Sequence, residues 1–152
     1  MHRAALIGLA VTNLRVATQR LPALPAYPSF VTIATTSKCN IRCEFCINQY
    51  DATPDNRFHM PRDMKDRVFR EVFPFVKKTA LSVAGEPLFD PDFIATVRLA
   101  KSYGIEIEMT SNGLLLGRTG YTEAILECVH RINFSIDGGV KETFEKLRPG
   151  AS

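Results

Sequence analysis

Three cysteines lie within eight residues of the chain, in the order Cys39, Cys43 and Cys46. Their spacing is too tight for the disulfide framework of a small secreted domain, and thiolates are soft ligands that suit iron–sulfur clusters and zinc. Three thiolates on one loop can each hold one iron at a corner of a 4Fe–4S cubane. The remaining iron would then be open to a ligand from outside the chain. The spacing therefore predicts a reduced, metal-binding loop with one reactive iron.

Three more stretches that could do chemistry each follow a segment with the composition of a buried strand. They are Gly85–Glu86–Pro87, Thr110–Ser111–Asn112–Gly113 and Ser135–Ile136–Asp137–Gly138. In parallel βα architectures, the loops that leave the carboxyl ends of the strands converge on one side of the sheet. We therefore expect these stretches to lie beside the cysteine loop.

Four strands are needed to position these stretches. Phe30 to Thr36 is apolar and β-branched, as a strand buried on both faces should be. The other strands are expected at residues 81–84, 105–109 and 132–136. Strands that alternate with helices indicate the α/β class, with a parallel sheet and right-handed crossovers.

Helices are expected in each of the three intervals between the strands. The first should begin at Pro61 and end or kink at Pro74. The other two are expected at residues 92–103 and 121–130, and Gly104 stops the earlier of them. The buried face of the first helix is predicted to carry Met64, Val68, Val72, Phe75 and Val76.

Taken together, these motifs resemble those of the radical S-adenosylmethionine (radical SAM) enzymes, from about Phe30 to the C-terminus. The spacing C-x3-C-x2-C matches the family's cluster motif, and Ala84–Gly85–Glu86–Pro87 resembles its GGEP motif with alanine in the first place. The stretches after the third and fourth strands resemble T-x-N-G and S-x-D-G. The resemblance implies a partial parallel (β/α)6 barrel, of which the chain would supply about the first four βα units.

The resemblance also implies a reaction. Cys39, Cys43 and Cys46 would bind a 4Fe–4S cluster, and the amino and carboxylate groups of SAM would chelate the open iron. One electron from the reduced cluster would cleave SAM to a 5'-deoxyadenosyl radical, which would modify an unidentified peptide or small molecule. Gly85 would let the backbone approach the methionine moiety, and Glu86 would accept a hydrogen bond from its ammonium group. The cofactor contacts implied in this way are Phe45, Gly85, Glu86, Pro87, Thr110, Ser111, Asn112, Ser135 and Asp137.

Charge and hydropathy narrow the choice of partners. The formal net charge is +3, but the basic residues are scattered, so a nucleic acid partner is not indicated. The apolar run from Ala4 to Val11 is much shorter than the roughly 20 residues that span a membrane. We expect a cytoplasmic enzyme with an electron donor such as flavodoxin or ferredoxin.

Two regions are expected along the chain. Residues 1–28 should form an N-terminal helix and a proline-rich linker, and residues 29–152 a radical SAM core that stops before strands five and six. The overall resemblance is closest to members with an added C-terminal cluster domain, called SPASM, which would begin beyond Ser152.

An unfinished parallel sheet has an exposed edge, so we predict that this chain alone is poorly stable and weakly active. The check is anaerobic expression beside a longer form of the protein. Equal melting temperatures and equal cleavage of SAM would contradict the prediction.

Two alternatives remain at this point. The cysteine loop could belong to a zinc-stabilised binding module, with Cys128 or His59 as the fourth ligand. That interpretation leaves the other strand-exit motifs unexplained, and a lone cysteine such as Cys128 is usually a small core residue. The chain could also be a non-catalytic iron–sulfur remnant. Arg148 resembles a family position after the fourth strand, but no role is assigned to it.

Overall fold

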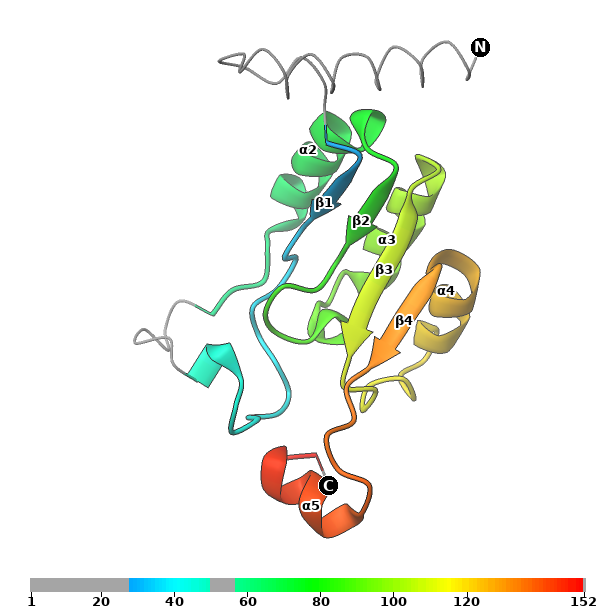
Figure 1. The fold of residues 1–152 in the computed structure, drawn as a ribbon. Coiled ribbons are helices and arrows are strands. Elements are labelled where there is room, and N and C mark those ends of the chain that lie inside the picture. Colours follow the sequence, from blue (N-terminus) through cyan, green and yellow to red (C-terminus); the bar gives the residue numbers. More distant parts are fainter. Residues whose placement is uncertain (1–27, 50–56, 152) are drawn as a thin grey trace, which may run out of the picture.

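The computed structural model describes residues 28–49 and 57–151 (Figure 1). The helix and linker predicted for residues 1–28 therefore lie outside the described residues, apart from Pro28. Part of the loop that connects the cysteines to the first predicted helix also lies outside them.

Four strands form one parallel sheet, in the same order in space as in the chain. They are β1 (Phe30–Thr32), β2 (Lys78–Ala80), β3 (Glu106–Ser111) and β4 (Arg131–Phe134). Each strand is added beside the one before it, with Val31 opposite Thr79, Thr79 opposite Ile107, and Met109 opposite Ile132. This is the arrangement of successive units in a (β/α) barrel, so the predicted α/β fold is confirmed.

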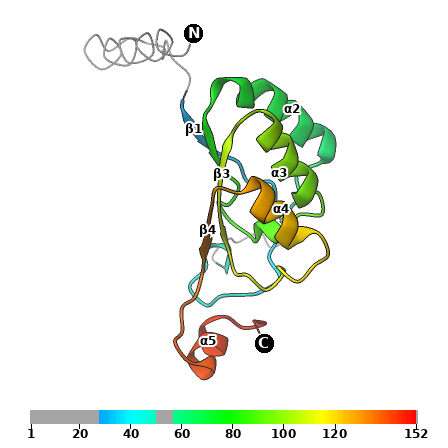
Figure 2. The same ribbon diagram turned by 90° about the vertical axis from the view of Figure 1, so that its right-hand side faces the viewer.

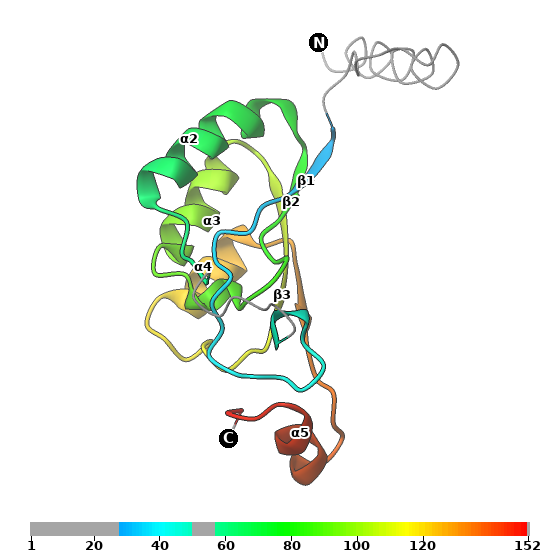
Figure 3. The same ribbon diagram turned by 90° about the vertical axis from the view of Figure 1, so that its left-hand side faces the viewer.

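Three helices cover one face of this sheet, as the two side views show (Figures 2 and 3). They are α2 (Arg62–Val72), α3 (Phe93–Ser102) and α4 (Tyr121–Cys128). A fourth helix, α5 (Lys141–Leu147), follows β4 and lies beyond the carboxyl ends of the strands (Figure 1). Short 3-10 turns are found at η1 (Ile47–Gln49), η3 (Phe73–Phe75) and η4 (Pro87–Phe89). None of the helices in the described part of the chain has the length and hydropathy needed to cross a membrane.

The hydrophobic core lies between the sheet and these three helices. Phe69 and Phe73 stack with their ring centroids 4.5 Å apart, and Ile107 and Met109 project from β3 into the same layer. Burying one such side chain stabilises the fold by roughly 1.5–3 kcal/mol. The core therefore fixes the strands, and with them the loops that leave their carboxyl ends.

The opposite face of the sheet carries polar side chains. Glu108 of β3 forms ion pairs with Lys78 of β2 at 2.5 Å and with Arg131 of β4 at 3.3 Å. Phe30 of β1 is 46% exposed, so the prediction that this strand is buried on both faces is wrong. The physical reason is that α2, α3 and α4 all pack on the same side of the sheet (Figure 2).

The predicted position of the second strand is also wrong. We expected residues 81–84, but β2 lies at Lys78–Ala80, and only Leu81 extends its ladder by donating its N–H to the Glu108 carbonyl at 3.1 Å. A charged residue can begin this strand because Lys78 is paired with Glu108 across the sheet. The other three strands were placed correctly but with different ends.

The predicted buried face of the first helix is only partly correct. Val68 and Val72 pack against the core, whereas Met64 and Phe75 are about half exposed. The fully buried positions of α2 are Lys65 and Phe69. A hydrophobic pattern misses Lys65, because its burial depends on a charged partner from another part of the chain. The expected effect of Pro74 is confirmed, since α2 ends at Val72 and a 3-10 turn follows.

Candidate cluster and cofactor site

A cavity of about 340 Å³ opens at the carboxyl ends of the strands. Ten of the twelve predicted site residues line it: Cys39, Cys43, Phe45, Cys46, Gly85, Glu86, Thr110, Ser111, Asn112 and Ser135. Pro87 and Asp137 do not line it. Six further residues, which no sequence motif predicts, also line the cavity: Ile41, Asn48, Arg57, Ser82, Val83 and Arg148. The structure therefore brings the four strand exits together, as the parallel topology requires.

The cysteine loop follows β1 and is held by the segment that returns to α2. Ser37 donates its N–H to the Phe58 carbonyl at 3.0 Å, and Met60 donates to the Thr35 carbonyl at 2.8 Å. All three cysteines are free of disulfides; Cys43 is buried, and Cys39 and Cys46 are half-buried. Their thiols are therefore available to a metal on the cavity wall.

Burial opposes the ionisation of two of these thiols. Burial raises the pKa of Cys39, and the nearby carboxylate of Glu86 and the neighbouring thiols act in the same direction. Burial also raises the pKa of Cys43, although the positive charge of Arg148 partly offsets it. Thiolates at such positions need positive charge beside them, which bound iron would supply.

The donor set fits an iron–sulfur cluster better than a zinc ion. Zinc needs four ligands around one ion, yet no group of three His, Cys, Asp or Glu side chains among the described residues is arranged to hold a single metal ion. Cys128 is buried in the core between sheet and helices, as predicted. His59 Nδ1 lies 2.9 Å from Thr36 Oγ1, and its ring packs against Phe89. Neither proposed fourth zinc ligand lines the cavity.

Glu86 ties the exit of β2 to the exit of β3. Its Oε1 accepts hydrogen bonds from the N–H of Leu88 at 3.1 Å and the hydroxyl of Ser111 at 2.7 Å, and its Oε2 accepts from the N–H of Asn112 at 2.7 Å. The residue is 2% exposed. This bracing role is not predicted by the sequence motif, and the expected contact of Glu86 with the ammonium group of SAM stays a prediction.

Gly85 allows a close approach between two backbones. Its φ is +85°, and a Cβ atom built there would lie 2.7 Å from the Lys38 carbonyl oxygen and from the Ser37 carbonyl carbon. Next to it, Glu86 donates its N–H to the same Lys38 carbonyl at 2.9 Å. A glycine is required here because the cysteine loop lies directly against it.

Asn112 connects the exit of β3 to the cysteine loop. Its Nδ2 donates to Asn40 Oδ1 at 2.9 Å and lies 3.9 Å from the sulfur of Cys39. Its Oδ1 accepts from the N–H of Leu114 at 3.0 Å, which holds the turn itself. The T-x-N-G motif therefore contributes an amide that fixes the neighbourhood of one predicted cluster ligand.

Arg148 joins the exit of β4 to the cysteine loop. Its guanidinium forms an ion pair with Asp137 Oδ2 and lies 5.8 Å from the centroid of the Phe45 ring. Arg148 is 6% exposed, so the charge is buried at the cavity wall. In the sequence, the signal available for this contact is a basic residue eleven positions after Asp137. It resembles a family position, but the resemblance assigns it no role.

The segment after α5 packs directly on the cysteine loop. Arg42 donates its N–H to the Pro149 carbonyl at 3.0 Å, and Glu44 donates to the Leu147 carbonyl at 3.1 Å. Ile41, Cys43 and Ala151 form a small buried apolar cluster at this contact. The cysteine loop is thus held by backbone groups of a segment that no sequence motif predicts.

Comparison with known proteins gives the same family as the sequence motifs. The family model described as the Radical SAM superfamily matches residues 33–152. A probable GTP 3',8-cyclase of Archaeoglobus fulgidus is 35% identical over 132 residues, which cover 86% of this chain and 37% of that protein. A tungsten-containing aldehyde ferredoxin oxidoreductase cofactor-modifying protein of Pyrococcus furiosus is 31% identical over 110 residues. The matched residues cover 71% of this chain and 30% of that protein.

A solved structure shows the same fold at low identity. Streptococcus suis SuiB bound to S-adenosylmethionine aligns with a TM-score of 0.70 and 17% identity, over 94% of this chain and 32% of SuiB. The chain thus spans about a third of the length of the curated relatives it matches. Because the family model matches residues 33–152, which make up more than half of the chain and include the motifs that build the cavity, the chain belongs to the radical SAM superfamily.

Proposed function

We propose that this chain holds a 4Fe–4S cluster through Cys39, Cys43 and Cys46 and binds SAM at the iron they leave open. The reactions of the superfamily are SAM-dependent radical reactions, and its cofactors are a 4Fe–4S cluster and SAM. One observation carries the proposal for these residues: three free thiols share one cavity wall with the exits of β2, β3 and β4. When both are bound, the cluster supplies the electron that cleaves SAM reductively.

The chain's own part in this reaction is to bind and orient. Gly85 and Glu86 would border the methionine moiety, and Pro87 would fix the turn that follows them. Phe45, which is 52% exposed beside the cavity, offers an apolar ring for the adenine. The polar groups for the ribose and carboxylate would come from the exits of β3 and β4, namely Thr110, Ser111, Asn112, Ser135 and Asp137.

Arg148 has a supporting role in this proposal. Its guanidinium lies between Asp137 and Phe45, so it would fix the position of the ring proposed for the adenine relative to the exit of β4. Its positive charge near Cys43 would also favour the thiolate that iron requires.

The partners proposed are an unidentified substrate, either a peptide or a small molecule, and a low-potential electron donor such as flavodoxin or ferredoxin. A cytoplasmic location is part of the proposal, because thiols that must bind iron need reducing conditions. A SPASM domain beyond Ser152 stays a prediction from resemblance.

The proposal is tested by anaerobic reconstitution of the protein with iron and sulfide, followed by SAM and dithionite. We expect about four irons and four sulfides per chain, with broad absorption near 400 nm, and release of 5'-deoxyadenosine. Zinc bound without sulfide would contradict the proposal and support the binding-module alternative. A stable cluster that releases no 5'-deoxyadenosine would identify the chain as a non-catalytic remnant.

Replacing Arg148 by glutamine is expected to lower the free energy of unfolding by about 1–2 kcal/mol. The substitution leaves Asp137 without its cation, and Phe45 loses the group that lies over its ring. Chemical denaturation of the apoprotein measures the loss, and the rate of iron release to a chelator should rise in the same variant. Lys146→Gln, an exposed change in the last turn of α5 two residues before Arg148, is the control. Equal values for both variants would contradict the bridging role.

A further inference from the structure

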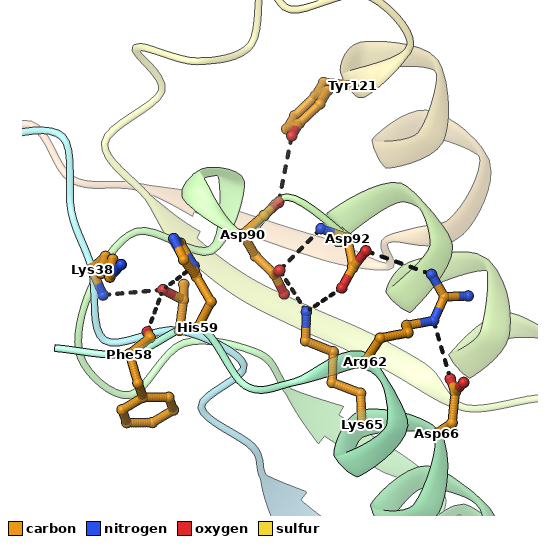
Figure 4. Close-up of polar contacts among 10 residues, drawn as sticks. Lys38, Phe58, His59, Arg62, Lys65, Asp66, Asp90, Asp92 and Tyr121 are labelled. Atoms are coloured by element: carbon orange, nitrogen blue, oxygen red, sulfur yellow. Dashed lines mark hydrogen bonds and ion pairs between the residues drawn. The ribbon is translucent and has the colours of Figure 1, made fainter.

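A buried ion pair lies outside the cavity, between α2 and the turn that follows β2 (Figure 4). Lys65 Nζ is 2.6 Å from Asp90 Oδ1, and the two side chains are 1% and 0% exposed. Asp92 Oδ2 is a second acceptor for the same ammonium group at 3.1 Å. Neither Lys65 nor Asp90 lines the cavity, and the proposed reaction does not use the pair.

Asp90 is one end of a short turn whose other end is Glu86. The turn is η4 (Pro87–Phe89), in which Phe89 donates its N–H to the Glu86 carbonyl at 2.9 Å and Asp90 donates to the Pro87 carbonyl at 3.1 Å. Glu86 also caps the turn by accepting from the N–H of Leu88. A displacement at Asp90 would therefore reach Glu86 through a single hydrogen-bonded unit.

Glu86 in turn holds the exit of β3. Its carboxylate accepts from Ser111 and from the N–H of Asn112, and Asn112 contacts the cysteine loop through Asn40. A continuous set of bonds thus runs from Lys65 on α2 through η4 to the two polar residues proposed to face SAM. Only its last members line the cavity.

Stability alone explains the pair poorly. Two charges taken out of water must recover a large desolvation cost, and apolar residues of similar size often stabilise a fold as well or better. Asp90 Oδ2 makes no hydrogen bond within the described part of the chain, whereas Oδ1 accepts from both Lys65 and the N–H of Asp92 at 3.0 Å. What such a pair provides is a directional contact, which fixes Asp90 in one position.

We propose that Lys65 is a positioning residue for SAM binding, acting through Asp90 and the η4 turn on Glu86. The inference rests on the proposed function, since it concerns the affinity of the same site. The role differs from a merely structural one, because it links a contact on α2 to the affinity for SAM and not only to the stability of the fold.

The test is the double substitution Lys65→Met/Asp90→Leu, which removes both charges and leaves apolar side chains in their place. The reconstituted protein is compared with wild type in iron content, free energy of unfolding and dissociation constant for SAM, measured by equilibrium dialysis. We expect unchanged iron content, stability equal to wild type or higher, and SAM binding weakened about tenfold. The matched control is Arg67→Met, which removes an exposed i,i+4 ion pair with Glu71 from the same helix and should leave the SAM affinity unchanged.

The outcomes separate the two proposals. If the wild-type protein takes up a cluster and binds SAM but the double variant binds it equally well, the positioning role is wrong and the proposed function stands. If the wild-type protein does not bind SAM, the proposed function itself fails, and the positioning role with it. Should the double variant fail to fold, Lys65→Met/Asp90→Asn takes its place with the same expected loss of affinity, and an unchanged affinity would again overturn the inference.

Discussion

Replacing Cys43 by alanine should reduce cluster content to background and lower 5'-deoxyadenosine release by more than about a hundredfold. Cys43 is the most buried of the three loop cysteines and the middle ligand of the motif, so two separated thiols would remain to hold four irons. Iron and sulfide analysis after anaerobic reconstitution measures the first effect. Chromatographic quantification of 5'-deoxyadenosine under dithionite measures the second.

Cys128→Ala is the matched control for this substitution. Both cysteines are buried and both have a raised pKa because of burial, but Cys128 lies in the core between the sheet and the helices. The control should keep its cluster and lose only the packing of one small side chain. If Cys43→Ala instead retained iron, sulfide and SAM cleavage at the level of the control, these thiols would not be the cluster ligands.

The second large effect is expected from Gly85→Ala. The new methyl group would lie 2.7 Å from backbone atoms of Ser37 and Lys38, where no side-chain rotation can relieve the clash. The positive φ of 85° adds strain that an L-residue does not readily accept. We expect the free energy of unfolding to fall by about 3–5 kcal/mol, which combines overpacking with backbone strain. Because the displaced segment leads into Cys39, cluster content should fall as well.

Gly104→Ala separates the clash from the strain. Gly104 has a similar φ of +72°, but a Cβ atom there would meet nothing within 4 Å. This control should lose only about 1–2 kcal/mol and keep its full cluster content. Urea denaturation of both apoproteins and iron analysis of both reconstituted forms make the comparison. Equal losses would show that contact with the cysteine loop is not what requires a glycine at position 85.

Much of the fold and of the site could be predicted because the relevant information is local. The cysteine spacing and the short motifs at 85–87, 110–113 and 135–138 each occupy a few consecutive residues. The topological rule that parallel strands end on one side then places them together, and the cavity lined by Cys39, Glu86, Ser111 and Ser135 confirms it. The predicted family, fold and cofactors are confirmed by the comparisons.

What could not be predicted depends on partners distant in the chain. Lys65 is buried because Asp90 faces it from 25 residues away, and a hydrophobic pattern read along one helix treats it as a surface residue. Lys78 opens β2 because Glu108 neutralises it from the third strand, so a search for apolar runs placed that strand three residues too late. In both cases a charged residue occupies a position that the hydrophobic pattern of its element does not predict. The pattern places Lys65 on the exposed face of the helix and leaves Lys78 outside the strand.

Glu86 and Arg148 illustrate a different limit. The family resemblance predicts that Glu86 contacts SAM, whereas its three hydrogen bonds to Leu88, Ser111 and Asn112 show a carboxylate that braces two strand exits. Arg148 received no role from the sequence, although its buried charge joins Asp137 to the cysteine loop. A motif indicates that a residue belongs to a site, whereas its contacts within the chain depend on the three-dimensional arrangement.

The central claim is that the three thiolates leave one iron of the cubane for SAM, and Mössbauer spectroscopy of protein reconstituted with iron-57 tests it most directly. On addition of SAM, we expect the signal of one iron of the four to change its isomer shift, while the other three keep the values of thiolate-bound irons. A spectrum in which no iron responds to saturating SAM would mean that SAM does not coordinate the cluster, and it would contradict the claim.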